Sequence, residues 1–197
     1  SIFNAFRLPG LALPLMCMFI FEFANMVYPT LWAFWVREVF DWPTIYIGLS
    51  LAGYGLLLAL VQGALMPVLI TLIGDYRTLV LGIAAAVIGM VGFGFTTTVT
   101  TMIVFVMTAA LSDLTPPLLT AIASNATDED RQGVVQGVIA ALSSIAAFLS
   151  PLLMTGLFQM SVDSKGTYFP GAPFIFASVL ILLMVPLIGR IRPNADR

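Results

Sequence analysis

A stretch without a single charged residue runs from Trp42 to Gly74 in this chain of 197 residues. A membrane-crossing helix needs about 20 consecutive, mostly apolar residues, so this stretch is long enough to cross a bilayer. The rest of the chain has the same character, because 60% of all residues are hydrophobic and only 9% are charged. Soluble domains carry about 25% charged residues. The chain is therefore not a water-soluble globule, and we predict an all-α membrane protein.

The charge inventory excludes several functions. With 8 Lys and Arg and a net charge of -2, the chain has no basic surface for nucleic acid. It has no His and one Cys, so a metal site could come only from carboxylates, and we expect neither a metal nor a cofactor. The sequence also has no phosphate-binding loop and no hydrolase motif. We expect a protein that is not an enzyme and not a nucleotide-driven pump.

Six spans account for the whole chain as a single six-helix transmembrane domain, residues 1–197. The stretch from Thr78 to Ser124 is too long for one helix, so we expect the chain to turn at Thr96–Thr101. A run of β-branched threonines is a poor helix interior. The expected spans are residues 11–35, 46–72, 78–96, 100–123, 133–159 and 170–188.

The positions of the cations predict the orientation, because Lys and Arg resist translocation. With a cytoplasmic N-terminus, only Arg37 and Lys165 of the 8 cations lie outside. Trp32, Trp35 and Trp42 then gather at the outer interface, where aromatic anchors are common. We expect a multi-pass plasma-membrane protein with both termini in the cytoplasm. The start of the chain lacks Met and a cleavable signal peptide, which suggests a piece of a longer protein or a processed product.

Two carboxylates lie inside the expected spans, Glu22 in the first and Asp113 in the fourth. A charged Asp at the centre of a bilayer costs about 2.5–3.5 kcal/mol on insertion scales, so such a residue usually faces a cavity or a partner and marks an ion or proton path. No Lys or Arg lies at the same depth in the sequence. We predict that Glu22 and Asp113 carry proton coupling. The alternative is that either one bonds a neighbouring helix or lies nearer the interface.

Polar residues near these carboxylates are candidates for contact with a solute. Asn25 follows Glu22 by three positions, which places both side chains on one face of the helix. Gln62 lies in the middle of the charge-free span, where it either contacts solute or forms a hydrogen bond between helices. The predicted substrate-binding residues are Asn25, Met26, Tyr28 and Gln62.

Small residues recur at every fourth position in two spans, a pattern that allows membrane helices to approach closely. The predicted helix-packing residues are Gly55, Ala59 and Gly63 in the second span and Gly133 and Gly137 in the fifth. The alternative is the general abundance of small residues in membrane helices. Either explanation fits a helical bundle, and neither identifies a solute.

Several short motifs carry a family resemblance. They are Tyr28–Trp32, Ile47–Gly53, Gly74–Arg77, Leu81-Gly82, Pro117, Gln132–Gly137, Ser150-Pro151 and Phe169–Phe174. On these motifs the chain resembles the C-terminal six-helix half of a major facilitator superfamily transporter. It is similar in particular to the tetracycline-resistance-like branch of drug:proton antiporters. Gly74, Asp75 and Arg77 then form a tight turn on the cytoplasmic side.

The resemblance implies two inverted three-helix repeats, paired with a second six-helix half around a central cavity. Gln62 falls where tetracycline exporters carry a pocket Gln. Ala86 falls where they carry an acidic residue, and Pro67-Val68 replaces the Gly and Arg of their loop motif. Asp113 stands where relatives tend to have a small residue. These departures make tetracycline itself a doubtful solute.

We therefore expect secondary active transport of a small organic or drug-like solute, in the form of proton-coupled efflux by alternating access. The expected partners are the bilayer, the solute, protons and a second six-helix half, which is either an N-terminal half or a second copy of this chain. One alternative is an uncoupled facilitator or uptake carrier. Another is a membrane assembly module that transports nothing and pairs through its small-residue faces.

Overall fold

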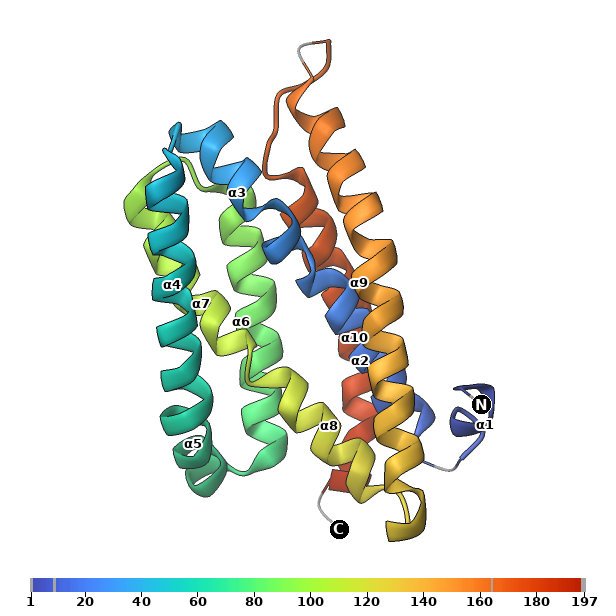
Figure 1. Ribbon diagram of the computed structural model, residues 1–197. Coiled ribbons are helices and arrows are strands. Elements are labelled where there is room, and N and C mark those ends of the chain that lie inside the picture. Colours follow the sequence, from blue (N-terminus) through green and yellow to red (C-terminus); the bar gives the residue numbers. More distant parts are fainter. Residues whose placement is uncertain (1, 9, 164, 196–197) are drawn as a thin grey trace.

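Helices make up all the regular structure that the chain shows. The computed structural model describes residues 2–8, 10–163 and 165–195, and every regular element in these ranges is helical. Six stretches are long and apolar enough to cross a membrane: Ala12–Phe40, Thr44–Ile73, Asp75–Phe95, Val99–Asn125, Glu129–Val162 and Ala172–Ile191. The predicted all-α architecture with six membrane helices is confirmed (Figure 1).

Three of the six spans are built from more than one α-helix. The helical elements in chain order are α1 (Ile2–Ala5), α2 (Ala12–Asn25), α3 (Val27–Phe40), α4 (Thr44–Leu60), the π-helical turn η1 (Val61–Leu65), α5 (Met66–Ile73), α6 (Asp75–Phe95), α7 (Val99–Ser112), α8 (Thr115–Asn125), the 3-10 turn η2 (Glu129–Arg131), α9 (Gln132–Val162) and α10 (Ala172–Ala195). The first span is α2 with α3, the second is α4 with η1 and α5, and the fourth is α7 with α8.

Prolines explain the interruptions in the first and fourth spans. A proline has no N–H to donate, and its ring clashes with the carbonyl four residues earlier. For Pro29 that carbonyl belongs to Asn25, the last residue of α2. For Pro117 it belongs to Asp113, which directly follows α7. Each break therefore occurs at the residue that a proline deprives of its helical hydrogen bond.

The second span is widened rather than broken. In η1 the N–H of Met66 bonds to the carbonyl of Val61, five residues earlier, and Pro67 cannot donate to Gly63. Single π-helical turns of this kind are frequent at functional sites. A proline alone does not interrupt a helix in this chain, because Pro151 lies inside the continuous α9.

Short turns join the spans. The third and fourth spans meet at the expected threonine run, where the side chain of Thr98 caps α7 by accepting a hydrogen bond from the N–H of Thr101 at 3.3 Å. Gly74 separates α5 from α6 with a φ of 85°, a conformation that favours glycine. Asp41 ends α3 in the left-handed region with a φ of 52°.

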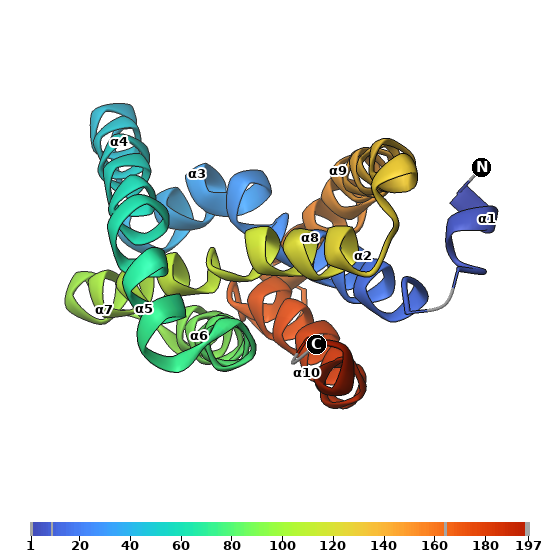
Figure 2. The same cartoon turned by 90° about the horizontal axis from the view of Figure 1, so that it is seen from below.

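The helices form three rows when seen along the bundle (Figure 2). The helices α6 and α10 lie on one side and pack against each other, and the interrupted spans α2 with α3 and α7 with α8 lie in the middle. On the other side stand α4 and, apart from it, α9, while α5 brings the end of the second span close to α6. The span containing α4 is the least buried of the six. Trp35 of the middle row packs against Phe93 of α6 and Phe174 of α10, and these buried side chains fill the space between the two rows.

Candidate functional site

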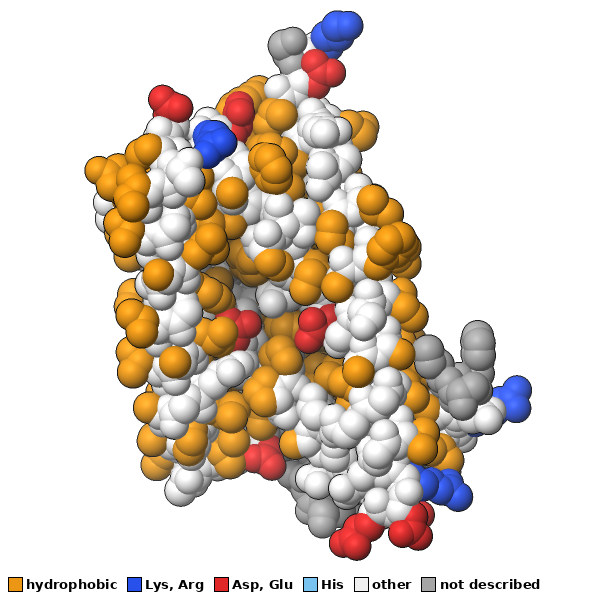
Figure 3. Space-filling view, viewed as in Figure 1, with side chains coloured by type: hydrophobic (Ala, Val, Ile, Leu, Met, Phe, Trp, Pro, Cys, Tyr) orange, Lys and Arg blue, Asp and Glu red, His pale blue; other side chains and the backbone are white. Residues whose placement is uncertain are grey.

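Polar side chains gather where the three interrupted spans face one another. Glu22 and Asn25 lie at the end of α2, Asp113 follows α7, and Gln62 lies in the π-helical turn. These side chains are half-buried. The space-filling view shows a hollow between α4 and α9, with acidic side chains at its mid-height (Figure 3). The site is thus a polar hollow in the middle of the bundle.

Asp113 receives two hydrogen bonds from the second span. The hydroxyl of Tyr54 on α4 donates to the Asp113 carboxylate. The Nε2 of Gln62 donates to the backbone carbonyl of Asp113 at 3.0 Å. Pro117 leaves this same carbonyl without its helical donor, so the Gln62 side chain replaces the missing N–H. The two contacts hold α4 and η1 to the break between α7 and α8.

The carboxylate of Glu22 interacts electrostatically with that of Asp113, and no cation lies between them in the described chain. The two carboxylates are close enough to interact by charge. In the described part of the chain neither forms an ion pair, and the side chain of Glu22 makes no hydrogen bond. The arrangement places two acidic groups in one hollow with no built-in positive partner. It can accept protons or a cationic group that enters from outside.

Three buried polar atoms near the breaks in the first and fourth spans have no hydrogen-bond partner among the described residues: Oδ1 of Asn25, the hydroxyl of Tyr28 and Oγ1 of Thr115. A buried polar group left unpaired costs about 1–3 kcal/mol, so such groups usually meet water or a ligand. The ring of Tyr28 is fixed by contacts with Phe93 and Phe174, at centroid distances of 5.5 and 5.7 Å. The three atoms are thus unpaired polar groups beside the two helix breaks.

An aromatic cluster lies next to the hollow at the α3 end. Trp35 is buried and packs edge-on against Phe93 and Phe174, at centroid distances of 5.5 Å each. Trp32 joins the cluster and donates from Nε1 to the hydroxyl of Ser50 on α4 at 2.8 Å. The cluster therefore packs this end of the bundle with tightly fitted apolar side chains.

Comparison with known proteins identifies the family. Residues 14–197 match the family described as the Major Facilitator Superfamily. The chain belongs to this superfamily. The resemblance seen in the sequence is thereby confirmed, and membership of this superfamily points to a transporter rather than an enzyme.

Curated relatives match between 76% and 93% of the chain. A class C tetracycline resistance protein of Escherichia coli is 30% identical over 172 residues, which cover 87% of this chain and 42% of that protein. A class G tetracycline resistance protein of Vibrio anguillarum is 28% identical over 183 residues, covering 93% and 46%. Hippocampus abundant transcript-like protein 1 of Homo sapiens is 26% identical over 164 residues, covering 76% and 32%. The chain thus spans less than half the length of these relatives.

Met26 and Gln62 have structural roles in this superfamily member. Met26 links α2 to α3, and its N–H bonds to the carbonyl of Glu22 at 3.1 Å. Gln62 forms the hydrogen bond between spans that was one of its two expected roles. Contact of either side chain with a solute stays a prediction, as it does for Asn25 and Tyr28.

The predicted packing glycines face open space within the described chain. A methyl group placed on Gly55, Gly63, Gly133 or Gly137 would meet no atom within 4 Å, and Ala59 is exposed. Spacing alone does not say which side of a helix faces its neighbours. The glycines in close contact with other elements are Gly82, Gly92, Gly94 and Gly171. A contact of the predicted residues with a partner stays a prediction.

The predicted turn is formed as a tight connection between α5 and α6. The hydroxyl of Thr78 donates to the carbonyl of Gly74 at 2.8 Å. Asp75 begins α6, where a negative charge is favourable at the positive end of the helix dipole. Arg77 is exposed. The cytoplasmic location of this turn stays a prediction.

Tyr54 is the site residue that the sequence predictions missed. It lies eight positions before Gln62, so two helical turns bring the two side chains to about the same face of the second span. In a span without charges, a tyrosine on the face of its central glutamine is a usable signal. No pattern in the sequence indicates that Tyr54 bonds to Asp113, which is 59 residues away.

Proposed function

We propose that the chain is one half of a secondary transporter that exports a small organic or drug-like solute in exchange for protons. The observation that carries this proposal is the pair Glu22 and Asp113, two carboxylates in one hollow without a cationic partner in the described chain. Isolated charges at this depth are costly, and they persist where function uses them. The tetracycline resistance relatives support a drug-like solute.

In this proposal the carboxylates alternate between two states. When both are charged, the hollow attracts a solute with a cationic or hydrogen-bond-donating group. When protons bind, this attraction is lost and the solute leaves. Because solute and protons compete for the same groups, uptake of protons from one side drives release of the solute on that side. Asn25, Met26, Tyr28 and Gln62 are the proposed solute contacts.

A second six-helix half would complete the cavity. The hollow is open between α4 and α9 (Figure 3), and both of these helices expose large apolar side chains such as Leu56, Leu60 and Phe148. The predicted packing glycines of α4, η1 and α9 have no atom of the described chain within 4 Å of an added methyl group, which leaves room for a partner helix. The curated relatives are more than twice as long as the matched region, which supports a missing half.

The proposed orientation places both termini in the cytoplasm of the cell and the protein in the plasma membrane. Arg37 and Lys165 lie at the end of the bundle where α3 and α9 finish. Arg77 and Arg131 lie at the opposite end, which the excess of cations marks as cytoplasmic.

The central test is solute flux by the full-length transporter that contains this chain, reconstituted in liposomes with and without a pH gradient. Glu22→Gln removes the titratable group and keeps its shape, so we expect gradient-driven flux to disappear while passive exchange continues. Glu38→Gln, at an exposed site on α3, is the matched control and should leave flux unchanged. Gradient-driven flux that survives Glu22→Gln would overturn the proposed role.

The same measurement separates the alternatives. If solute flux in the unchanged protein is the same with and without a pH gradient, an uncoupled facilitator is favoured. Complete absence of flux, with stable assembly into dimers, would favour the assembly module.

A further inference from the structure

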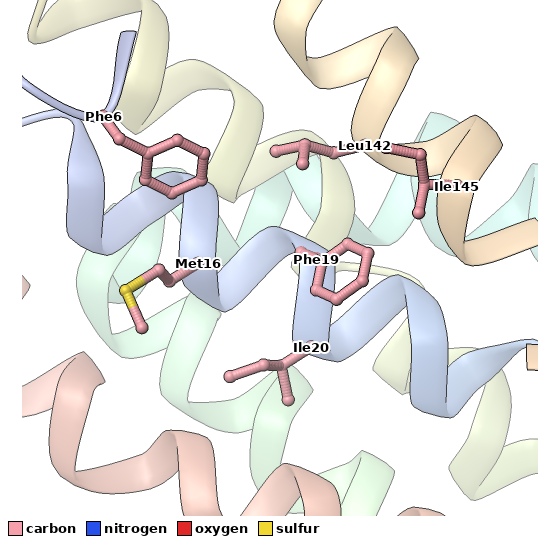
Figure 4. A pocket seen from close by; sticks show the side chains of 6 residues that line it. All are labelled: Phe6, Met16, Phe19, Ile20, Leu142 and Ile145. Carbon is pink, nitrogen blue, oxygen red and sulfur yellow. The ribbon is translucent and has the colours of Figure 1, made fainter. Parts of the chain in front are cut away.

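A second hollow lies away from the carboxylates. An open cavity of about 230 Å³ lies between the turn that follows α1, the first half of α2 and α9. Six apolar side chains line it: Phe6, Met16, Phe19, Ile20, Leu142 and Ile145 (Figure 4). Phe6 and Leu142 point toward each other across it. The lining exposes no polar surface, so the cavity suits a hydrocarbon chain and offers nothing to a polar solute.

The cavity lies on a flank of the bundle and not on the hollowed face. Both views place α1 on the far side of α9 from α4 (Figures 1 and 2). In the proposed function a second half covers the face between α4 and α9. The flank beside α1 then stays in contact with the bilayer, so lipid is the occupant with access to it.

The depth of the cavity fits the outer part of one leaflet. Met16 lies about one turn and Ile20 about two turns into α2, which is roughly 6 to 12 Å along the helix axis. The wall formed by α9 is firmly attached to α2 further along, where the hydroxyl of Ser150 donates to the carbonyl of Phe23 at 2.6 Å. The cavity thus lies between the start of the span and the point where α9 is bonded to α2.

A cation directly follows a residue of the cavity lining. Arg7 comes after Phe6 in the turn between α1 and α2, and its side chain is exposed. The N–H of Arg7 bonds to the carbonyl of Asn4 at 3.2 Å, which fixes this turn. A guanidinium can form two parallel hydrogen bonds with a phosphate group. Apolar surface at hydrocarbon depth and a guanidinium at the end of the span match the two parts of a phospholipid.

We propose that this cavity binds an anionic phospholipid, with one acyl chain against Phe6, Phe19 and Leu142 and the phosphate on Arg7. A net negative headgroup is preferred because a single cation then meets an uncompensated charge. The assignment of this flank to the bilayer rests on the proposed function. The apolar lining of the cavity and the position of Arg7 in the sequence do not depend on the proposed function.

The test measures lipid retention by the full-length transporter that contains this chain. The protein is reconstituted in phosphatidylcholine vesicles with a minor fraction of phosphatidylglycerol and then extracted into mild detergent. Native mass spectrometry counts the lipids that stay bound. We expect phosphatidylglycerol to be enriched about fivefold over its share in the vesicles, the effect of one basic residue near an anionic headgroup.

Two variants test separately the contact with the lipid headgroup and the contact with the acyl chain. Arg7→Gln, at an exposed position, should abolish the enrichment, whereas Arg77→Gln should keep it. Leu142→Trp fills the cavity and should reduce retention of both lipids, whereas Ile88→Trp on the exposed face of α6 should not. Unchanged enrichment in Arg7→Gln, or unchanged retention in Leu142→Trp, overturns the proposal. Lipid retention gives this answer whether or not the protein exchanges solute for protons.

Discussion

The Tyr54 hydroxyl donates a hydrogen bond to the carboxylate of Asp113 and thereby ties the second span to the fourth. Gln62, two turns further along the second span, donates to the backbone carbonyl of the same aspartate. A carboxylate is a strong acceptor, and a protonated carboxyl group is a weaker one. The protonation state of Asp113 is therefore linked to how strongly α4 is held against the broken span formed by α7 and α8.

The energy of this contact can be measured by a double-mutant cycle. Tyr54→Phe removes the donor, and we expect it to lower the free energy of unfolding in detergent by about 1–2 kcal/mol, since a hydrogen bond to a charged group is lost. In an Asp113→Asn background the same substitution should cost clearly less. Tyr46→Phe, at an exposed position on the same helix, is the control. Strictly additive effects of the two substitutions would show that they do not interact.

The role assigned to Gln62 depends on Pro117. Gln62→Leu leaves the Asp113 carbonyl without a donor, so we expect a loss of about 1 kcal/mol in thermal unfolding measurements. Pro117→Ala supplies a backbone N–H four residues after Asp113, which can take over this carbonyl. Gln62→Leu should then be close to neutral in the Pro117→Ala background. An equal cost in both backgrounds would mean that Gln62 stabilises the bundle in another way.

The sequence is sufficient to predict the membrane spans and the residues at which the first and fourth spans break. Long uncharged runs set the number of membrane helices, because few other structures satisfy their backbone in lipid. Pro29 and Pro117 each stand four residues after a break, so the deprived carbonyls of Asn25 and Asp113 could be located from spacing alone.

The pairing of side chains could not be predicted in the same way. Tyr54 and Asp113 are 59 residues apart, and their contact depends on how α4 is rotated against α7. The same limit applies to the small residues. Gly55 and Gly63 have the spacing of a packing face and contact no neighbour in the described chain, whereas Gly171 lies outside any such pattern and is tightly packed. Spacing defines a helix face, and the tertiary fold decides what that face meets.

Gly171 is predicted to be intolerant of any side chain. A Cβ at this position would overlap the backbone of Gly94 at the end of α6, and backbone atoms cannot move aside as a flexible side chain can. Gly171→Ala should therefore lower the unfolding free energy by about 1–3 kcal/mol, the usual cost of overpacking. Gly156→Ala, inside α9 with no atom within 4 Å of the new methyl group, should be neutral or stabilising by up to about 1 kcal/mol. Thermal unfolding of both variants gives the comparison, and equal stability of the two would contradict it.

The connection between α9 and α10 is predicted to loosen in alkali. The hydroxyl of Tyr168 in this connection donates to the carboxylate of Glu38 on α3 at 2.9 Å. Partial burial, this hydrogen bond and the negative charge of Glu38 raise the pKa of Tyr168 above its ordinary value of 10.0. A raised pKa means that the contact contributes fully below pH 10 and is lost as the pH rises through the higher value. Tyr168 is exposed over 56% of its surface, so the effect on overall stability is small.

The measurement is an alkaline titration of tyrosinate absorbance, with the signal of Tyr168 isolated by subtracting the curve of Tyr168→Phe. In the unchanged protein Tyr168 should ionise above pH 10. Glu38→Gln removes the negative charge that opposes ionisation, so the pKa of Tyr168 should fall toward its ordinary value. Asp41→Asn, an exposed acid just beyond α3, should leave the titration unchanged. A Tyr168 titration that is the same in Glu38→Gln and in the unchanged protein would show that this contact does not hold the α9–α10 connection in solution.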